Sequence, residues 1–371
     1  LPGSTPRSRP ALSISLARKL DEAASLAEDP VRLAMRAYFL RRLLLIVPTL
    51  LGITLLVFAI TRFLPGGPVE QALLQGQMAQ GDTSSGSGEG AGLSPGQVEQ
   101  LESYYGFDRP WYLAYAEWLG QVATGDLGQS YRYQIPVTSM ILDRLPVSLY
   151  YGLITFVFTY AVCVPLGILK AIRHRTRLDG ITSIIVFAGY AVPGYVLGAL
   201  LLVFFAFQLE WFPTGGFVSP FFADLGFWGK VWDLVRHSAL PLVCYLVGSF
   251  AFLTLLMKNS LLDNLAADYM RTAAAKGLSF RRAVFRHALR NSLIPIATNF
   301  GNAISLFVAG SFLIEKIFSI EGFGLLGYTS LIERDYPVVM GVLLPSSFLL
   351  LVGNVLSDLL ISTVDPRIRF D

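Results

Sequence analysis

Six long apolar runs dominate this sequence and constrain its fold more than any other feature. Each is about twenty residues long, the length of helix that crosses the roughly 30 Å hydrocarbon core of a bilayer at 1.5 Å per residue. Strands of a membrane barrel would instead alternate apolar and polar residues over about ten positions. The continuous runs therefore predict an all-α membrane protein with six transmembrane helices, at residues 43–61, 147–169, 181–208, 239–257, 293–314 and 338–361.

The overall composition supports a chain that lies in a lipid bilayer. Charged residues make up 15% of the 371 residues, whereas soluble proteins carry about 25%. The mean hydropathy is +0.55. Every apolar run contains or borders a proline, which lipid tolerates when neighbouring helices satisfy the freed backbone groups. We therefore expect kinked helices packed in a bundle.

The positions of the basic residues predict the orientation of the bundle. With six spans, 21 of the 29 Lys and Arg residues fall on the side that holds both termini, and seven fall on the other side. Arg62 lies at the outer edge of the first span. Because cytoplasmic loops are enriched in Lys and Arg, both termini are expected to be cytoplasmic. The net charge of +3 reflects this topology, so no nucleic-acid partner is expected.

Composition also divides the chain into segments. The sequence from Met35, MRAYFLRRLLL, resembles the start of a protein chain. The residues before it are therefore expected to be either a native tail or an upstream extension. A Gly- and Ser-rich stretch in the second loop is expected to be flexible. The predicted segments are a cytoplasmic tail 1–34, a first transmembrane helix 35–63, a periplasmic segment 64–146 with flexible 76–96, and a transmembrane core 147–371 with a cytoplasmic loop 258–292.

Several kinds of chemistry are absent from the sequence. It has no GxxxxGK[ST] phosphate-binding loop and no HExxH motif, and we expect no catalytic residue, cofactor or metal site. The three histidines fall on different loops, and the two cysteines fall inside spans, where small apolar packing is their expected role. Asp358, near the inner end of the last span, is expected to cap a helix or pair with a cytoplasmic arginine.

A few polar residues recur inside the last two spans. Their spacing of three places each set on one helical face. These residues have two possible roles. They either form hydrogen bonds between helices, worth about 0.6 kcal/mol each, or line a water-filled translocation path. A path without fixed charges argues against a proton- or sodium-coupled pump. The candidate path residues are Asn299, Asn302, Ser305, Asn354 and Ser357.

The stretch YMRTAAAKGLSFRRAVFRHALRNSLIP joins the fourth and fifth spans and is strongly basic. It predicts a helix over 268–276 that stops at Gly277, followed by a second helix that Ser279 caps. A face of small residues at Thr272, Ala273 and Ala274 could enter a groove on a partner protein. The alternative is a solvated basic loop held to anionic lipid.

These residues carry a family resemblance. RTAAAKG followed by HALRNSLIP resembles the coupling loop of permease subunits of ABC importers in the peptide/nickel class. His287 and Arg290 depart from the general importer pattern but resemble the oligopeptide branch. The phrases FLRRLLLIVPTLLGITLLVFAITRFLPGGP, YGFDRP, GDLGQSYR, EKIFSIEGFGLLG, RDYPVVMG and VDPRIRF resemble a B-type subunit, most closely of the Yej-type sub-branch.

The resemblance implies a type I ABC importer permease fold and a bacterial inner-membrane location. The chain would form one half of a heterodimeric pore with a C-type permease, above two cytosolic ATPase domains and below a periplasmic binding protein that delivers peptide. It would not itself be an enzyme. The residues expected to couple it to the ATPases are Arg271, Thr272, Ala273, Ala274, Lys276 and Gly277.

Two other functions compete with this one. An ion-coupled secondary transporter of small peptides or solutes would need no ATPase, but the scarcity of acidic residues in the spans counts against it. A membrane-anchored receptor or assembly factor would need a larger folded outer domain than the periplasmic segment provides.

Overall fold

The computed structural model describes residues 11–63, 67, 69–70, 95–104, 106–301, 303–304 and 310–364. Most of the expected flexible segment 76–96 and the start of the expected tail lie outside these residues. Within them the structure is helical, with one isolated antiparallel bridge between Gln129 and Pro136. The helices are α1 (Ala11–Phe63), α3 (Pro95–Tyr104), α4 (Trp111–Ala123), α5 (Val137–Ile172), α6 (Arg177–Ala191), α7 (Gly194–Leu201), η1 (Leu202–Gln208), η2 (Phe222–Asp224), α8 (Phe227–Ala266), α9 (Asp268–Ala275), α10 (Phe280–Ala283), η3 (Val284–Ala288), α11 (Leu289–Ser292), α12 (Ile294–Thr298), α14 (Phe312–Ile317), α15 (Phe323–Ile332) and α16 (Tyr336–Val364).

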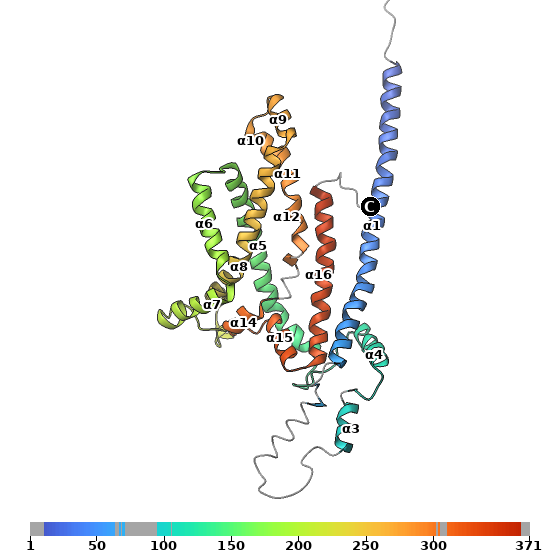
Figure 1. The fold of residues 1–371 in the computed structure, drawn as a ribbon, viewed down its shortest axis with the longest axis vertical. Coiled ribbons are helices and arrows are strands. Elements are labelled where there is room, and N and C mark those ends of the chain that lie inside the picture. The colour runs from blue at the N-terminus through green and yellow to red at the C-terminus, as the bar shows by residue number, and fades with distance from the viewer. Residues whose placement is uncertain are drawn as a thin grey trace, which may run out of the picture.

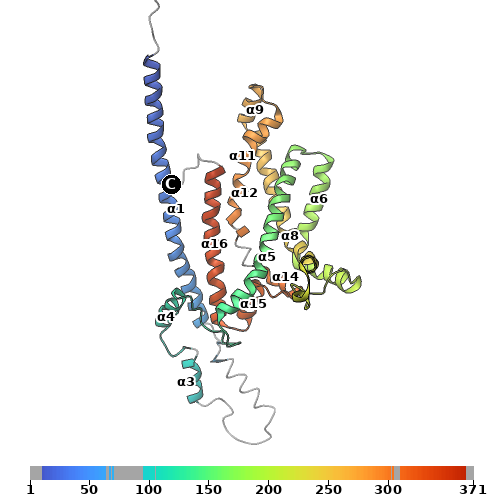
Figure 2. The ribbon, with the colours of Figure 1, turned by 180° about the vertical axis from the view of Figure 1, so that it is seen from behind.

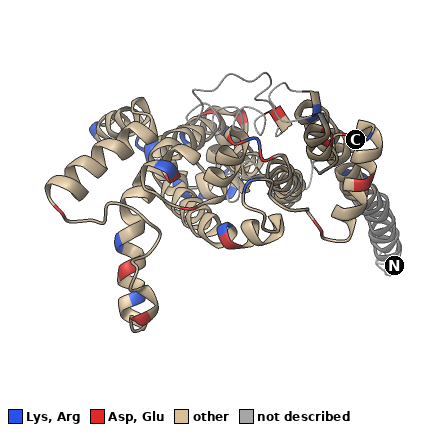
Figure 3. Ribbon diagram, turned by 90° about the horizontal axis from the view of Figure 1, so that it is seen from below, with Lys and Arg blue, Asp and Glu red and all other residues tan. Residues whose placement is uncertain are grey.

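Four helices in the described part of the chain are long and apolar enough to cross a membrane. They coincide with the first, second, fourth and sixth predicted runs (Figure 1). Most of the ribbon carries no charged residue, as expected for helices that lie in lipid (Figure 3). The four spans are Ala37–Phe63, Val137–Ile172, Phe227–Ala266 and Tyr336–Thr363.

The third predicted run, at 181–208, is not one continuous helix. It consists of α6 and the α7–η1 pair, which meet at an angle of 89°. Val192 at the junction is extended. The cause is Pro193, which follows it, because proline disfavours the helical conformation in the residue before it. A methyl group on Gly194 would lie 2.9 Å from the Cys244 carbonyl oxygen, so a glycine there lets the bend approach α8.

The fifth predicted run, at 293–314, is described only in part. Its first half contains the short helix α12, and its last residues lead into α14. Residues 302 and 305–309 lie outside the described residues, so the predicted span there stays a prediction.

Helices α5 and α8 form the central pair of the bundle. Gly167 of α5 permits their close approach, since a methyl group there would lie 2.7 Å from the Met257 side chain. At the edge of the bundle, α1 lies beside α16 (Figures 1 and 2). There Arg42 pairs with Asp358 at 2.7 Å, which confirms the predicted ion pair of that aspartate.

The two ends of the bundle carry different elements. Helices α9 and α10 stand at one end, called here the near end (Figures 1 and 2). Helices α3, α4 and α15 lie at the opposite end, called here the far end, and α14 lies toward it.

Candidate coupling surface and central cavity

Helix α9 ends as the sequence predicts. Gly277 has a φ of +83°, a left-handed conformation that glycine adopts without strain. Its N–H donates to the Ala274 carbonyl at 2.9 Å, and the Leu278 N–H donates to the Ala273 carbonyl at 3.2 Å. These bonds satisfy carbonyl groups that the end of the helix leaves free. The chain therefore turns sharply between α9 and α10.

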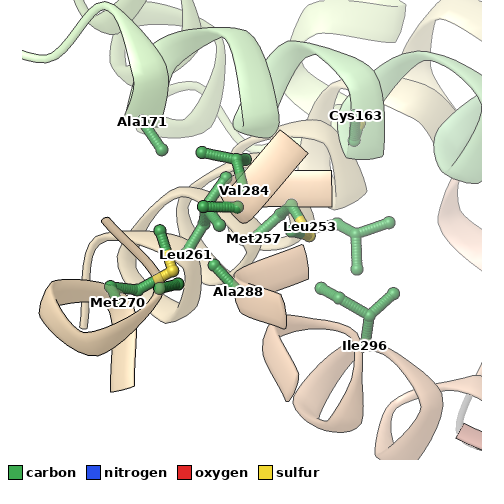
Figure 4. Close-up of a cluster of buried hydrophobic side chains, with 11 residues drawn as sticks. Cys163, Ala171, Leu253, Met257, Leu261, Met270, Val284, Ala288 and Ile296 are labelled. Atoms are coloured by element: carbon green, nitrogen blue, oxygen red, sulfur yellow. The ribbon is translucent and has the colours of Figure 1, made fainter. Parts of the chain in front are cut away.

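One side of α9 packs against the rest of the chain. Met270 and Ala273 are both 7% exposed and belong to a buried cluster with Leu261, Val284 and Ala288 (Figure 4). Met270 reaches that cluster from α9, while Leu261 comes from α8 and Val284 from η3 (Figure 4). The near-end helix is thus seated on the end of α8.

The burial of Ala273 corrects the predicted face of small residues on this helix. Ala273 does not belong to an exposed small-residue face, because successive residues of a helix point about 100° apart and Ala273 points inward. Thr272 and Ala274 are exposed. The surface that a partner could contact at the near end comprises Arg271, Thr272, Ala274, Lys276 and Gly277, all of them exposed.

The remainder of the basic loop presents exposed charged side chains. Arg281, Arg282 and Arg286 are all exposed on α10 and η3. Ser279 occupies the N-cap position of α10, but its side chain makes no capping hydrogen bond, so that part of the prediction is wrong.

Two lysines that the sequence analysis counted as loop charges are buried at the near end. Lys170 is 0% exposed, and its ammonium group lies 3.1 Å from the Asp179 carboxylate. Lys258 donates to both oxygens of the same carboxylate at 2.7 and 2.9 Å. The Lys170 ammonium also donates to the hydroxyls of Thr182 and Ser183 at 2.8 Å each.

This cluster, called here the Asp179 cluster, joins three helices. Lys170 comes from the last turn of α5, Asp179 from the first turn of α6, and Lys258 from α8. Because breaking a buried ion pair leaves an uncompensated charge, the three helix ends are held together as one unit. Sequence reasoning missed the cluster because the partners lie on three different helices.

A cavity of about 700 Å³ lies between α5, the start of α7, α8 and the described residues Asn299, Ala303, Gly310, Ser311 and Ile314. The described residues that line it are polar or apolar, and none of them is charged. They are Ser148, Tyr151, Gly152, Thr155, Phe156, Thr159, Tyr160, Gly194, Tyr195, Cys244, Tyr245, Gly248, Ser249, Phe252, Leu253, Asn299, Ala303, Gly310, Ser311 and Ile314.

Helix α5 gives this cavity a stripe of hydroxyl groups. Tyr151, Thr155 and Thr159 recur at helical spacing, all three line the cavity, and their hydroxyls have no hydrogen-bond partner among the described residues. A buried polar group normally has a partner, and these three hydroxyl oxygens are buried in this conformation, so they could bond to water or to a solute only after the helices move. The spacing of these three residues within an apolar run was the signal that the sequence analysis overlooked.

The structure separates the predicted path residues. Asn299 lines the cavity. Ser357 is instead buried between helices, where its hydroxyl donates to the Thr298 carbonyl at 2.8 Å and accepts from the Gly301 N–H at 3.2 Å. Asn354 lies one turn before it on α16, where the backbone meets Gly301. Asn302 and Ser305 lie outside the described residues.

A buried carboxyl group lies on α14, toward the far end (Figure 1). Glu315 of α14 is 2% exposed, and its carboxyl group accepts from the Leu325 N–H at 2.6 Å and from the Tyr245 hydroxyl at 3.4 Å. Burial raises the pKa of the Glu315 carboxyl above its ordinary value. The sequence analysis placed this residue in an outer loop and assigned it no role.

Comparison with known proteins adds independent evidence. Residues 163–370 match the family model of the binding-protein-dependent transport system inner membrane component. The chain is 41% identical to the peptidoglycan transport system permease protein YejB of Agrobacterium fabrum, over 91% of this chain and 99% of that protein. It is 37% identical to the inner membrane ABC transporter permease protein YejB of Escherichia coli O157:H7, over 91% of this chain and all of that protein.

A third relative extends the likeness. The oligopeptide transport system permease protein AppB of Bacillus subtilis is 36% identical, over 91% of this chain and all of that protein. With its apolar helices and full-length relatives of this kind, the chain is a multi-pass inner-membrane protein that belongs to the family of binding-protein-dependent transport system inner membrane components.

Proposed function

We propose that this chain is one permease subunit of an ATP-driven importer of oligopeptides or peptide-like compounds. The relatives named above are permease proteins of transport systems for peptidoglycan and for oligopeptides, two cargoes that contain peptide. The observation that carries the proposal is the near end, where a short exposed helix is seated firmly on the end of a long span.

The proposed complex contains four kinds of component. The chain pairs with a related C-type permease, and two cytosolic ATPase domains bind beneath the pair. A periplasmic binding protein delivers the peptide from outside. The absence of a phosphate-binding loop in this sequence is consistent with ATP hydrolysis by separate subunits.

The proposed topology has six spans with both termini in the cytoplasm. The distribution of basic residues supports it. In this orientation the near end faces the cytoplasm and the far end faces the periplasm. The segments 1–34, 35–63, 64–146 and 147–371 keep the boundaries expected from the sequence, with 258–292 as the coupling loop.

In the proposed mechanism, ATP binding draws the two ATPase domains together, and α9 follows the groove into which it fits. Arg271, Thr272, Ala274, Lys276 and Gly277 face that groove, whereas Ala273 anchors the helix from beneath. The seat of α9 on α8 passes the movement to the Asp179 cluster. The ends of α5, α6 and α8 then move together, and the cavity changes the side to which it opens.

Peptide would cross through the central cavity. The amide of Asn299 offers hydrogen bonds to a peptide backbone of any sequence, and the buried hydroxyls of Tyr151, Thr155 and Thr159 would add to them once the helices move. The lack of charge in the described lining suits cargo with varied side chains. Cargo selection would rest mainly with the binding protein.

The direct test is reconstitution of the complete complex in liposomes. We expect uptake of a labelled peptide that requires ATP and the binding protein. Uptake by this chain alone under an ion gradient would instead establish a secondary transporter. A complex that binds peptide at its outer segment and transports nothing would establish a receptor.

The coupling role of α9 has its own test. Replacing Ala274 with Glu places a bulky acid in the proposed groove and is expected to abolish uptake while the protein stays in the membrane. The matched control is Ala123→Glu, which adds the same charge at the exposed end of α4. Normal peptide-stimulated ATPase activity in the Ala274→Glu complex would contradict the coupling role.

A further inference from the structure

The turn from α14 to α15 lies toward the far end of the molecule, and the buried residue Glu315 of α14 comes just before it (Figure 1). Phe318 and Ile320 of this turn are buried against Tyr151, Leu240 and Cys244 of α5 and α8. The Phe318 carbonyl accepts a hydrogen bond from the Gly216 N–H at 2.8 Å. The turn therefore packs between α5, α8 and the loop that precedes α8. Helices α14 and α15 with the turn between them are called here the plug.

The Glu315 carboxyl group ties the two helices of this plug to each other. It projects from α14 and accepts from the Leu325 N–H in the first turn of α15 at 2.6 Å. Glycines make room for it, since a methyl group on Gly322 would lie 2.5 Å from the carboxyl carbon. A side chain at Gly310 would collide with the carboxyl oxygen as well. The turn is thus built around this one carboxyl group.

The same carboxyl group ties the plug to the cavity wall. The Tyr245 hydroxyl of α8 donates to it at 3.4 Å and accepts from the Ser311 N–H at 3.1 Å. The Tyr245 ring stacks on Tyr151 of α5, with ring centroids 5.7 Å apart. Both tyrosines line the cavity. A solute that separates these rings would disturb the contact between Tyr245 and Glu315.

We propose that Glu315 is a latch that holds the α14–α15 turn closed over the far end of the cavity, with Tyr245 linking the latch to the cavity wall. Glu315 is a positioning residue, because it holds the turn and does not itself line the cavity. The inference rests on the proposed function, in which this end must open to receive cargo.

The chain provides its own reporter for opening. Cys244 is 2% exposed and packs with Phe318 and Ile320, so the closed plug shields it. The sequence has only two cysteines. Replacing Cys163 with Ser leaves Cys244 as the sole thiol of this subunit, and a membrane-impermeant thiol reagent added outside right-side-out vesicles then reports access from the far end.

The experiment compares four complexes in that background, each with all of its partner subunits and without ATP. Glu315→Leu removes the acceptor and is expected to speed Cys244 labelling by roughly tenfold or more, because the half-buried Leu325 N–H loses its partner. Glu315→Gln keeps an acceptor oxygen and is expected to remain within about threefold of the parent. Glu321→Leu is the matched control, because it removes from the same turn a carboxylate that is 73% exposed and pairs with Arg144 at the surface.

Two results would overturn the latch. One is parent-like labelling in Glu315→Leu, and the other is equal acceleration in Glu321→Leu. If Glu315→Leu fails to assemble, Tyr245→Phe removes only the hydroxyl and is expected to speed labelling several-fold; unchanged labelling there would also overturn the latch. Failure of the proposed function is a different result, seen as absent ATP-driven uptake in the parent complex whatever the labelling rates.

Discussion

The two ends of the molecule each bury a carboxyl group, but they satisfy it by different means. At the near end, Asp179 lies within hydrogen-bond distance of the ammonium groups of Lys170 and Lys258. At the far end, Glu315 accepts from a backbone N–H and a tyrosine hydroxyl. The Asp179 contacts join full charges, whereas the Glu315 contacts come from neutral donors.

This difference matches what each end would have to do in the proposed transport cycle. A carboxylate between two lysines is costly to separate from them, because any separation leaves buried charges uncompensated. Such a cluster suits helix ends that move as one body. A carboxyl group held by neutral donors is released at the smaller cost of a few hydrogen bonds, which suits a turn that opens and closes.

The largest predicted effect tests the near end. Replacing Asp179 with Asn leaves two buried ammonium groups without a counter-charge and is expected to lower the free energy of unfolding by roughly 3–5 kcal/mol. Denaturant titration of the purified protein in mixed micelles measures it. Replacing Asp179 with Leu together with Lys170→Met and Lys258→Met removes all three charges and is expected to restore most of the loss. A loss below about 1 kcal/mol in Asp179→Asn would remove the contrast between the ends.

A second prediction concerns pH at the far end. The raised pKa of Glu315 means that the closed turn binds the proton more tightly than the open turn. The closed state is therefore most stable below the ordinary glutamate pKa and loses that advantage as pH rises through the raised pKa. We expect Cys244 labelling from outside to quicken over that range in the parent, relative to Glu315→Gln at each pH.

The ratio of the parent labelling rate to the Glu315→Gln labelling rate at each pH removes the effect of pH on the Cys244 thiol itself. Tyr245 on α8 and Tyr151 on α5 are the other titratable groups near Glu315. Lys316, its neighbour on α14, lies over the Tyr328 ring at 5.6 Å. A constant ratio between the two complexes across the range would show that Glu315 does not titrate in the latch.

The smallest predicted effect concerns a third carboxylate, on the side of the bundle. Asp358 pairs with Arg42, whose side chain is 42% exposed. Because solvent screens such a pair, Asp358→Asn is expected to lower the free energy of unfolding by at most about 1 kcal/mol. The same micelle titration measures it. An effect as large as that of Asp179→Asn would show that burial does not govern the ranking of these carboxylates.

The features that the sequence predicted correctly are local ones. The four long spans follow from the lengths of the apolar runs. The end of α9 follows from Gly277, because glycine adopts the left-handed conformation of a helix stop without strain. An ion pair between Asp358 and an arginine was one of the two roles predicted for that residue, because a lone acid near a basic helix end has few other partners.

The features that the sequence did not predict depend on packing between distant segments. Nothing near Lys170 shows that it would be buried against Asp179, and nothing near Glu315 shows that Leu325 would donate to it. Ala273 was assigned to the wrong side of α9, because a helix of eight residues is oriented by its neighbours. The four-residue spacing of Tyr151, Thr155 and Thr159 can be read from the sequence, but the cavity that these residues line cannot.

The uncharged lining of the cavity has a kinetic consequence. Hydroxyl and amide groups without fixed charges hold a solute weakly, and a pathway conducts only when its sites release what they bind. In the proposed complex, a peptide in the cavity would therefore dwell briefly compared with the turnover of the ATPase domains. The pace of uptake would then be set by the motor, and two peptides of different sequence, once delivered, would cross at nearly the same rate.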